Sequence, residues 1–165
     1  MKTVIYLCLI ILASFLTHQK EIFSQTKQSS IESLSERAEV ILTGKVINQK
    51  SKWNDDQTRI FTQSTIQVDE YLKGNDANKN ITITTPGGEV GEVGELYTHM
   101  PRFSSDEEVL LFIKKDKNNV DYKIVDGEDG KLTLVRNEKT GELVTSFNKK
   151  VSSLKSEIKS YVEKQ

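Results

Sequence analysis

The segment Val109–Ile113 reads Val-Leu-Leu-Phe-Ile, and this unbroken apolar run constrains the fold more than any other part of the chain. Successive side chains of a β-strand point to opposite faces, so a strand with this sequence needs apolar cover on both sides. We therefore predict that Val109–Ile113 is a central strand of a sheet that is buried on two faces.

Two longer segments, 40–46 and 60–69, alternate apolar and polar residues. This period of two predicts two long strands, each with one face toward solvent. The intervening segment 50–57 holds Asn54, Asp55 and Asp56, residues typical of turns. Further strands are expected at 81–85, ended by Pro86, and at 120–125, 131–136 and 143–146, with turns at 116–119 and at Thr140-Gly141.

A helix is predicted at each end of this series of strands. Ser29 and Glu32 have the spacing of a capping box, and apolar residues recur on one helical face, so a short helix is expected over 30–37. Near the C-terminus, apolar residues separated by four and three positions predict an amphipathic helix. We expect it to pack on the rest of the fold; the alternative is a helix that docks on another protein. Its expected apolar stripe is Phe147, Val151, Leu154, Ile158 and Tyr161.

About seven short strands between two helices predict a mainly β fold, a closed or nearly closed antiparallel barrel. Long first and second strands that bend suit a five-stranded Greek-key barrel with an added hairpin. We expect one barrel domain over residues 25–147 and a C-terminal helix over 148–165 packed on it.

The N-terminus has the three-part layout of a secretory signal peptide: Lys2, an apolar run from Val4 to Leu16, and a polar stretch that ends at Ser24. A membrane anchor is the competing interpretation, but a spanning helix needs about 20 apolar residues and this run is shorter. We predict cleavage after Ser24, no membrane insertion of the mature chain, and a secreted or periplasmic location.

Cys8 is the only cysteine and lies inside this apolar run. After cleavage no disulfide, thiolate metal site or cysteine nucleophile can form, so the hydrophobic core must stabilise the domain. Removing residues 1–24 from a chain of 23 basic and 24 acidic residues leaves 21 and 23, with both signs mixed. Without a basic stripe, nucleic acid is not an expected partner.

Several segments resemble a family of uncharacterised secreted bacterial domains: "AEVILTGKVINQKSKW", "TIQVDEYLKG" and "EEVLLFIKK", with "PGGEVG" and "MPRF". The order of these segments is also remotely similar to the netrin-like OB barrel of the tissue inhibitors of metalloproteinases. That resemblance implies an OB-like barrel, and a binding activity directed at a proteinase or another extracellular protein. Those inhibitors chelate zinc with an N-terminal cysteine, whereas this chain has "QTKQSSIESL" there, so only the scaffold carries over.

The segment Thr85–Glu108 is long for a connection in a small domain, and such loops are often functional. Its glycines and its glutamates suit a contact loop that meets a cation or a basic partner. They also suit simple turns or bulges, with an edge strand over Glu95–His99, and the sequence leaves both interpretations open. Trp53 and Phe103 are either binding anchors or residues that close the barrel end. The candidate binding residues are Trp53, Glu89, Glu92, Glu95, Tyr97, His99 and Phe103.

Catalysis and metal binding have weaker support. His99 is the only histidine of the predicted mature chain, whereas most zinc sites use several His or Cys ligands. A Ser-His-Asp triad would also need His99, and no "GxSxG" element accompanies it. The segment 126–130, "DGEDG", offers carboxylates to calcium but lacks the ligand spacing of a helix-loop-helix site. We therefore predict no catalytic residue, no metal and no cofactor.

The sequence favours a non-catalytic, secreted binding module, inhibitor-like in its finer form, for an extracytoplasmic protein that it does not identify. Two alternatives remain: a hydrolase, metal-dependent or not, that uses His99 with loop carboxylates, and a structural subunit of an envelope complex.

Overall fold

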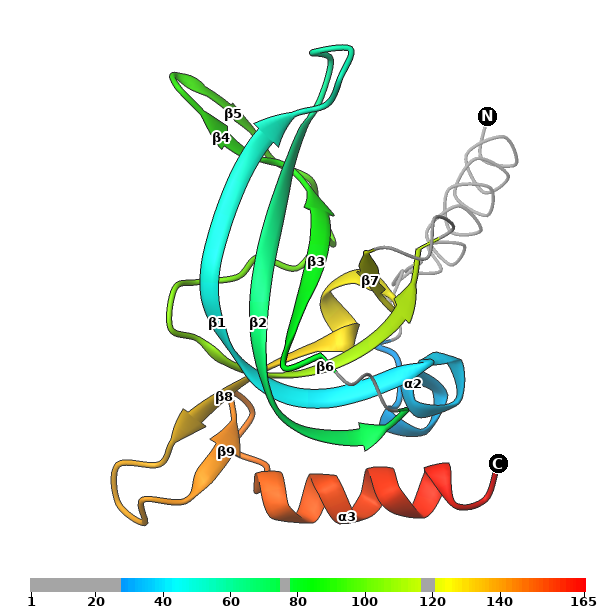
Figure 1. Ribbon diagram of the computed structural model, residues 1–165. Helices are drawn as coiled ribbons and strands as arrows, with labels where there is room; N and C mark the ends of the chain where they lie inside the picture. Colours follow the sequence, from blue (N-terminus) through cyan, green and yellow to red (C-terminus); the bar gives the residue numbers. More distant parts are fainter. Residues whose placement is uncertain (1–27, 75–77, 117–120) are drawn as a thin grey trace, which may run out of the picture.

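The computed structural model describes residues 28–74, 78–116 and 121–165 (Figure 1). The predicted signal peptide, residues 1–24, lies outside the described residues, as does most of the predicted turn at 116–119. In the described part of the chain, no helix combines the length and the apolar character needed to cross a bilayer. The helices are α2 (Ile31–Arg37) and α3 (Val151–Val162), with a short 3₁₀ turn η1 (Gly127–Gly130). The strands are β1 (Val40–Trp53), β2 (Ile60–Lys73), β3 (Asn80–Pro86), β4 (Gly88–Val90), β5 (Val93–Glu95), β6 (Glu108–Lys115), β7 (Tyr122–Ile124), β8 (Lys131–Arg136) and β9 (Leu143–Thr145).

Five of these strands close into a barrel, which confirms the predicted mainly β, OB-like fold class. The order β1-β2-β3-β7-β6 returns to β1 because β6 also pairs with β1. All contacts around the ring are antiparallel except the single parallel register between Ile83 of β3 and Tyr122 of β7. Strands β8 and β9 extend the sheet beyond β6 as the predicted added hairpin.

The central strand β6 separates two hydrophobic cores, as its apolar run requires. Val109, Leu111 and Ile113 point into the barrel, where they meet residues of β1, β2 and β3. Leu110 and Phe112 point outward and pack against α2 and α3. All five side chains are fully buried. One strand therefore joins the barrel interior to the layer of helices.

The prediction that one face of the first half of β1 contacts solvent is wrong. The alternating pattern of residues 40–46 predicts one wet face, yet residues 40–44 are all buried. Ile41 and Thr43 face the helical layer, while Val40 and Leu42 face the barrel interior. The helices cover the face that was expected to contact water. Beyond residue 46, the side chains of β1 are exposed or half-buried.

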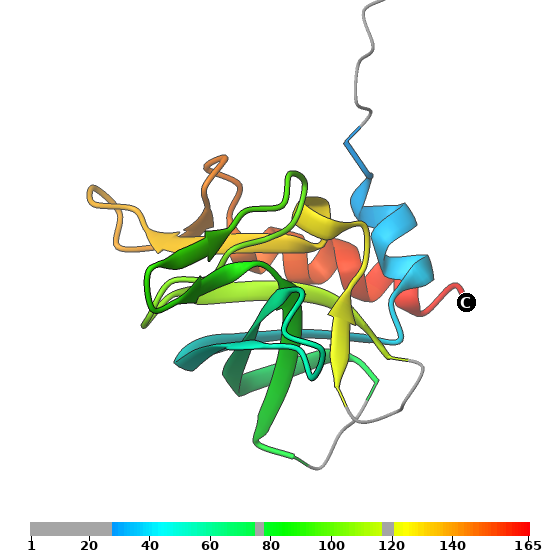
Figure 2. The same ribbon diagram turned by 90° about the horizontal axis from the view of Figure 1, so that it is seen from above.

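Both predicted helices are present and pack on the outer core, but their starts differ from the expectation. Ser30, not Ser29, caps α2, because its Oγ accepts a hydrogen bond from the Ser33 amide at 3.2 Å. Helix α3 buries Val151, Leu154 and Ile158 in the outer core and begins after Phe147, which is 74% exposed. Figures 1 and 2 show α2 beside the C-terminal end of α3.

Candidate binding cleft

The upper half of the β1–β2–β3 sheet has a polar inner face. In the lower half, Val46, Ile66 and Ile81 fill the barrel as part of the apolar core. Above them, the inner face carries hydroxyl and amide side chains on directly paired positions of the three strands. These residues are Gln49 and Ser51 of β1, Thr62 and Ser64 of β2, and Thr85 of β3. They line the floor of a cleft of about 480 Å³.

Two polar atoms at this floor are unsatisfied. Ser64 is fully buried, and its Oγ forms no hydrogen bond with any described residue. The same holds for Nε2 of Gln49, which lies opposite Ser64 on the neighbouring strand. By contrast, Ser51 and Thr62 bond each other at 2.9 Å. Burying a polar group without a partner costs free energy, so these two atoms lower the stability of the fold at the floor of the cleft.

A small hairpin, β4–β5, lies near the upper ends of β1, β2 and β3 (Figure 1). Its residues line one side of the cleft. Its entry requires glycine: Gly88 has a φ of 132°, and a Cβ there would overlap the hydroxyls of Ser51 and Thr62. Thr62 Oγ1 also donates to the Gly87 carbonyl at 2.7 Å. The close approach of backbone to hydroxyls holds the hairpin against the polar floor.

The other wall of the cleft is the segment 96–103, which an ion pair anchors from below. Glu107 and Lys131 are 2.6 Å apart, and each side chain is only 11% exposed. Glu107 also accepts hydrogen bonds from Thr133 Oγ1 at 2.6 Å and from the Ser104 amide at 2.9 Å. Burial raises the pKa of Glu107, but the hydrogen bonds outweigh this effect and the pKa lies below its ordinary value.

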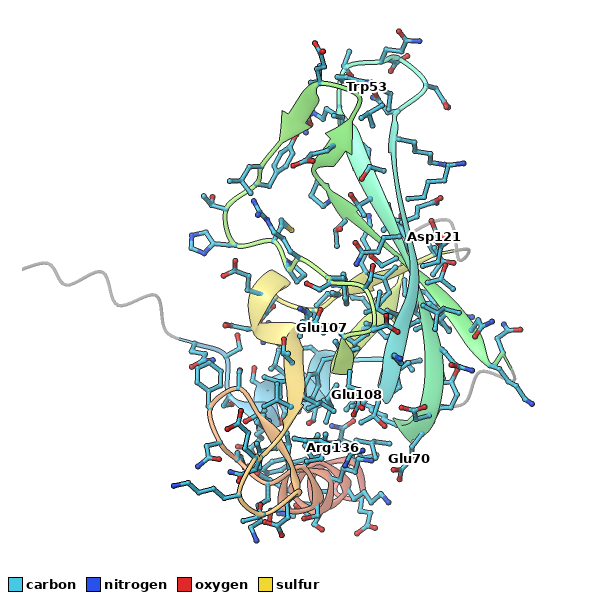
Figure 3. All side chains as sticks on the ribbon, turned by 90° about the vertical axis from the view of Figure 1, so that its left-hand side faces the viewer. Trp53, Glu70, Glu107, Glu108, Asp121 and Arg136 are labelled. Atoms are coloured by element: carbon cyan, nitrogen blue, oxygen red, sulfur yellow. The ribbon has the colours of Figure 1, made fainter. Side chains whose placement is uncertain are left out.

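Lys131 also contacts two residues of the cleft wall, Arg102 and Phe103. Its ammonium donates to the Arg102 carbonyl at 2.5 Å and lies 5.1 Å from the centre of the Phe103 ring. The Phe103 side chain packs against the barrel core. Figure 3 shows Glu107 between Trp53, at one end of the molecule, and Glu70 and Arg136, toward the other.

The structure brings four of the seven predicted binding residues together: Glu89, Glu95, Tyr97 and Phe103 line the cleft. Glu95 is held in place, since its Oε2 accepts hydrogen bonds from the Ile60 amide at 3.0 Å and from the Tyr97 hydroxyl at 3.2 Å. The edge strand suggested for Glu95–His99 is wrong, because β5 ends at Glu95.

The other three predicted residues lie outside the cleft lining. Glu92 is exposed in the turn of the β4–β5 hairpin. Trp53 is half-buried at the end of β1. His99 is exposed with a φ of 61°, and its carbonyl, not its ring, accepts a hydrogen bond from the Glu128 amide.

The acidic segment considered for calcium makes protein contacts instead. Asp126 pairs with Arg37 and accepts a 2.6 Å hydrogen bond from Ser29 Oγ. These contacts, with the serine hydrogen bond as the larger cause, lower the pKa of Asp126. Asp129 accepts from the Ser29 amide at 2.8 Å. Within the described ranges, no three His, Cys, Asp or Glu side chains converge in a way that could hold a metal ion.

The floor of the cleft and its anchor were not predicted from the sequence. Thr62 and Ser64 lie at alternate positions between Ile60 and Ile66, so the period of two alone places them on an ordinary inward face. Small polar residues at inward positions of a strand were the available signal. Nothing in the local pattern indicated that Glu107 and Lys131 would meet, because 23 residues separate them in the chain.

Neither protein-family models nor curated proteins give a match to this chain.

Proposed function

We propose that this chain is an extracytoplasmic, non-catalytic module that binds another protein through the rim of the cleft. The rim consists of the β4–β5 hairpin and residues 96–103. The observation that carries the proposal is the exposure of three large apolar side chains on this short stretch. Val93, Leu96 and Met100 are 47%, 69% and 38% exposed, respectively. Exposed apolar groups that cluster in this way favour a contact surface.

The rim is held in place, which suits binding. Glu95 fixes the base of the hairpin to Ile60, Gly88 packs on the sheet, and the Glu107–Lys131 pair supports Arg102 and Phe103. A surface that is ordered before binding loses less conformational entropy when a partner arrives.

The chemistry of the rim also indicates the partner. Glu89 and Glu92 are exposed on the hairpin beside the apolar residues, and Glu128 borders the next stretch of the same loop. Arg102 is the basic residue of segment 96–103. The complementary partner surface is an apolar patch flanked by lysine or arginine.

Site-specific photo-crosslinking tests the proposal. A photoreactive amino acid at position 96 is expected to give a defined adduct in living cells, whereas the same group at position 147 is not. Phe147 is the matched control because it is also exposed and apolar, at 74%, but lies near the other end of the molecule, between β9 and α3. Mass spectrometry identifies the adduct.

Charge reversal supplies the second arm of this test. Glu89→Lys with Glu92→Lys is expected to reduce the adduct at position 96 while the melting temperature stays unchanged, because both side chains are exposed. Equal adducts from positions 96 and 147 would refute the proposed rim. Loss of the adduct in Trp53→Ala alone would instead move the binding surface to the tip of the β1–β2 hairpin.

Inhibition of a proteinase is the finer form of this proposal, and it rests on the netrin-like resemblance of the sequence. It predicts that the crosslinked partner is a proteinase whose turnover falls when the purified chain is added. A partner with no proteolytic activity, recovered in fixed stoichiometry from an envelope complex, would favour the structural-subunit alternative.

A further inference from the structure

We propose that the cleft itself binds an uncharged carbohydrate, which bonds to Gln49 and Ser64 at the floor and packs against the aromatic wall. This site shares the β4–β5 hairpin and residues 96–103 with the protein-binding rim, but the inference does not depend on that function. Its basis is the pair of unsatisfied polar atoms at the floor of a cleft of about 480 Å³. That volume lies within the range of about 300–1,000 Å³ typical of small-molecule sites.

The unsatisfied atoms define what the ligand must offer. Gln49 Nε2 is a donor and needs an oxygen acceptor, while the Ser64 hydroxyl can donate or accept. Thr85, on the adjoining strand, adds a further hydroxyl that is 8% exposed. A ligand that carries several hydroxyl or carbonyl oxygens on adjacent atoms meets all three groups, as a sugar does.

The charge around the floor disfavours anionic ligands. The floor carries no ionisable side chain, and Glu95 at its edge already accepts two hydrogen bonds. At the rim, Arg102 is accompanied by Glu89, so no excess of positive charge is available to a phosphate. Nucleic acid depends on such positive charge for affinity. A neutral sugar does not need such positive charge.

The walls indicate a ligand with an apolar face. Tyr97, Phe103, Met100 and Pro101 line the side of the cleft opposite the sheet. A sugar ring presents hydroxyls at its edge and C–H groups on its faces, so it can bond to the floor while a face packs on an aromatic ring. A single buried water would satisfy the floor atoms, but it would leave this wall without a contact.

The hydrogen bonding of the floor favours a sugar over a peptide strand. Peptides that add to a sheet bond to an unpaired backbone edge. Here the floor strand β2 is paired on both sides, with β1 at Gln49–Ser64 and with β3 at Thr62–Thr85. On β2, only side chains remain for recognition, whereas β1 beyond Lys45 is not paired with β6 on its outer edge.

Nuclear magnetic resonance with isotope-labelled protein tests the inference. The probes are glucose, mannose, N-acetylglucosamine, cellobiose and chitobiose, with glycerol and tri-alanine as non-sugar controls. At least one sugar is expected to shift the side-chain amide signals of Gln49 in a saturable manner. The backbone amides of Ser51, Thr85 and Gly88 are expected to shift with the same dissociation constant, because they surround the cleft.

Matched variants assign the effect to the floor. Gln49→Leu and Ser64→Ala are each expected to weaken sugar binding about tenfold, because each removes one hydrogen bond to the ligand. Gln63→Leu and Thr65→Ala change neighbouring positions of β2 whose side chains point to the opposite face, so they are expected to leave the dissociation constant unchanged. Unchanged spectra away from the cleft show that each variant is folded.

Three results would overturn the inference. The first is that none of the five sugars shifts the Gln49 side-chain signals. The second is equal binding to glycerol or tri-alanine, which would show that the cleft does not select a sugar. The third is sugar binding that survives in both Gln49→Leu and Ser64→Ala, which would place the ligand elsewhere. The crosslinking test at position 96 measures a protein adduct rather than sugar binding, so its failure is distinguishable from these three results.

Discussion

Replacing Glu107 by glutamine is expected to destabilise the fold and to loosen the wall of the cleft. The carboxylate bonds to Lys131, Thr133 and the Ser104 amide, and both ionic partners are 11% exposed. Removing one partner of a fully buried ion pair typically costs about 3–5 kcal/mol. The cost here is smaller, because Lys131 keeps the Arg102 carbonyl and the Phe103 ring.

We therefore expect Glu107→Gln to lower the free energy of unfolding by about 2 kcal/mol at neutral pH. In a domain of this size, that change lowers the melting temperature by roughly 6–10 °C. Urea denaturation gives the free energy, and a double-mutant cycle with Lys131→Met isolates the coupling between the two side chains.

Asp106 supplies the matched control, because it forms an exposed ion pair with Lys45 one position before Glu107. Asp106→Asn preserves a side chain that tolerates the φ of 63° at this position, and it is expected to leave the melting temperature unchanged. A drop as large as that of Glu107→Gln would show that the segment is sensitive to any change. A coupling energy near zero in the double-mutant cycle would refute the role assigned to the Glu107–Lys131 pair.

The dependence on pH provides an independent check. The pKa of Glu107 is lowered in the folded protein, so its contribution to stability is fully present above the pKa of the unfolded chain. That contribution is lost as pH falls through the folded pKa. The difference in stability between the natural chain and Glu107→Gln is therefore expected to shrink on acidification from neutral pH. A difference that stays constant would contradict the lowered pKa.

Further predictions concern the core, the cleft and the processing of the chain. Leu111→Ala is expected to cost about 2–5 kcal/mol in urea denaturation, because the side chain is fully buried in the barrel. Ser64→Ala is expected to leave stability unchanged or raise it by up to about 1 kcal/mol, since the lost hydroxyl has no partner among the described residues. Gly88→Ala is expected to lower the melting temperature through overlap with Ser51 and Thr62. Mass spectrometry of the exported protein is expected to show an N-terminus near Gln25.

The predictions from sequence were most accurate for the burial of β6 and the bounds of β8. The apolar run of β6 fixed a two-faced strand, and β8 has the predicted bounds Lys131–Arg136. The residue pattern was a less accurate guide where two adjacent residues of the same type could both cap a helix. Either Ser29 or Ser30 could cap α2, and Ser29 instead bonds to Asp126 and Asp129, which lie about 100 residues away.

The cleft could be predicted only in part, because contacts distant in sequence build it. The glycines and glutamates of segment 85–108 indicated a contact loop, and this loop supplies one wall of the cleft. Tyr97 and Phe103 lie on that wall. The floor depends on the register between β1 and β2, which places Gln49 opposite Ser64. A register irregularity between Val46 and Asn48 sets that pairing, and no residue pattern in the sequence reveals it.

The long strands β1 and β2 therefore serve two purposes along one continuous sheet. Where β6 pairs with β1, from Val40 to Lys45, the inner face is apolar and the barrel is closed. Beyond this pairing, β1 and β2 continue without β6, and the inner face becomes polar at Gln49 and Ser64. An apolar face there would extend the core and add stability, since each buried methylene contributes about 0.8 kcal/mol. Unsatisfied polar atoms in that place lower stability, as in sites whose residues are kept for binding rather than for folding.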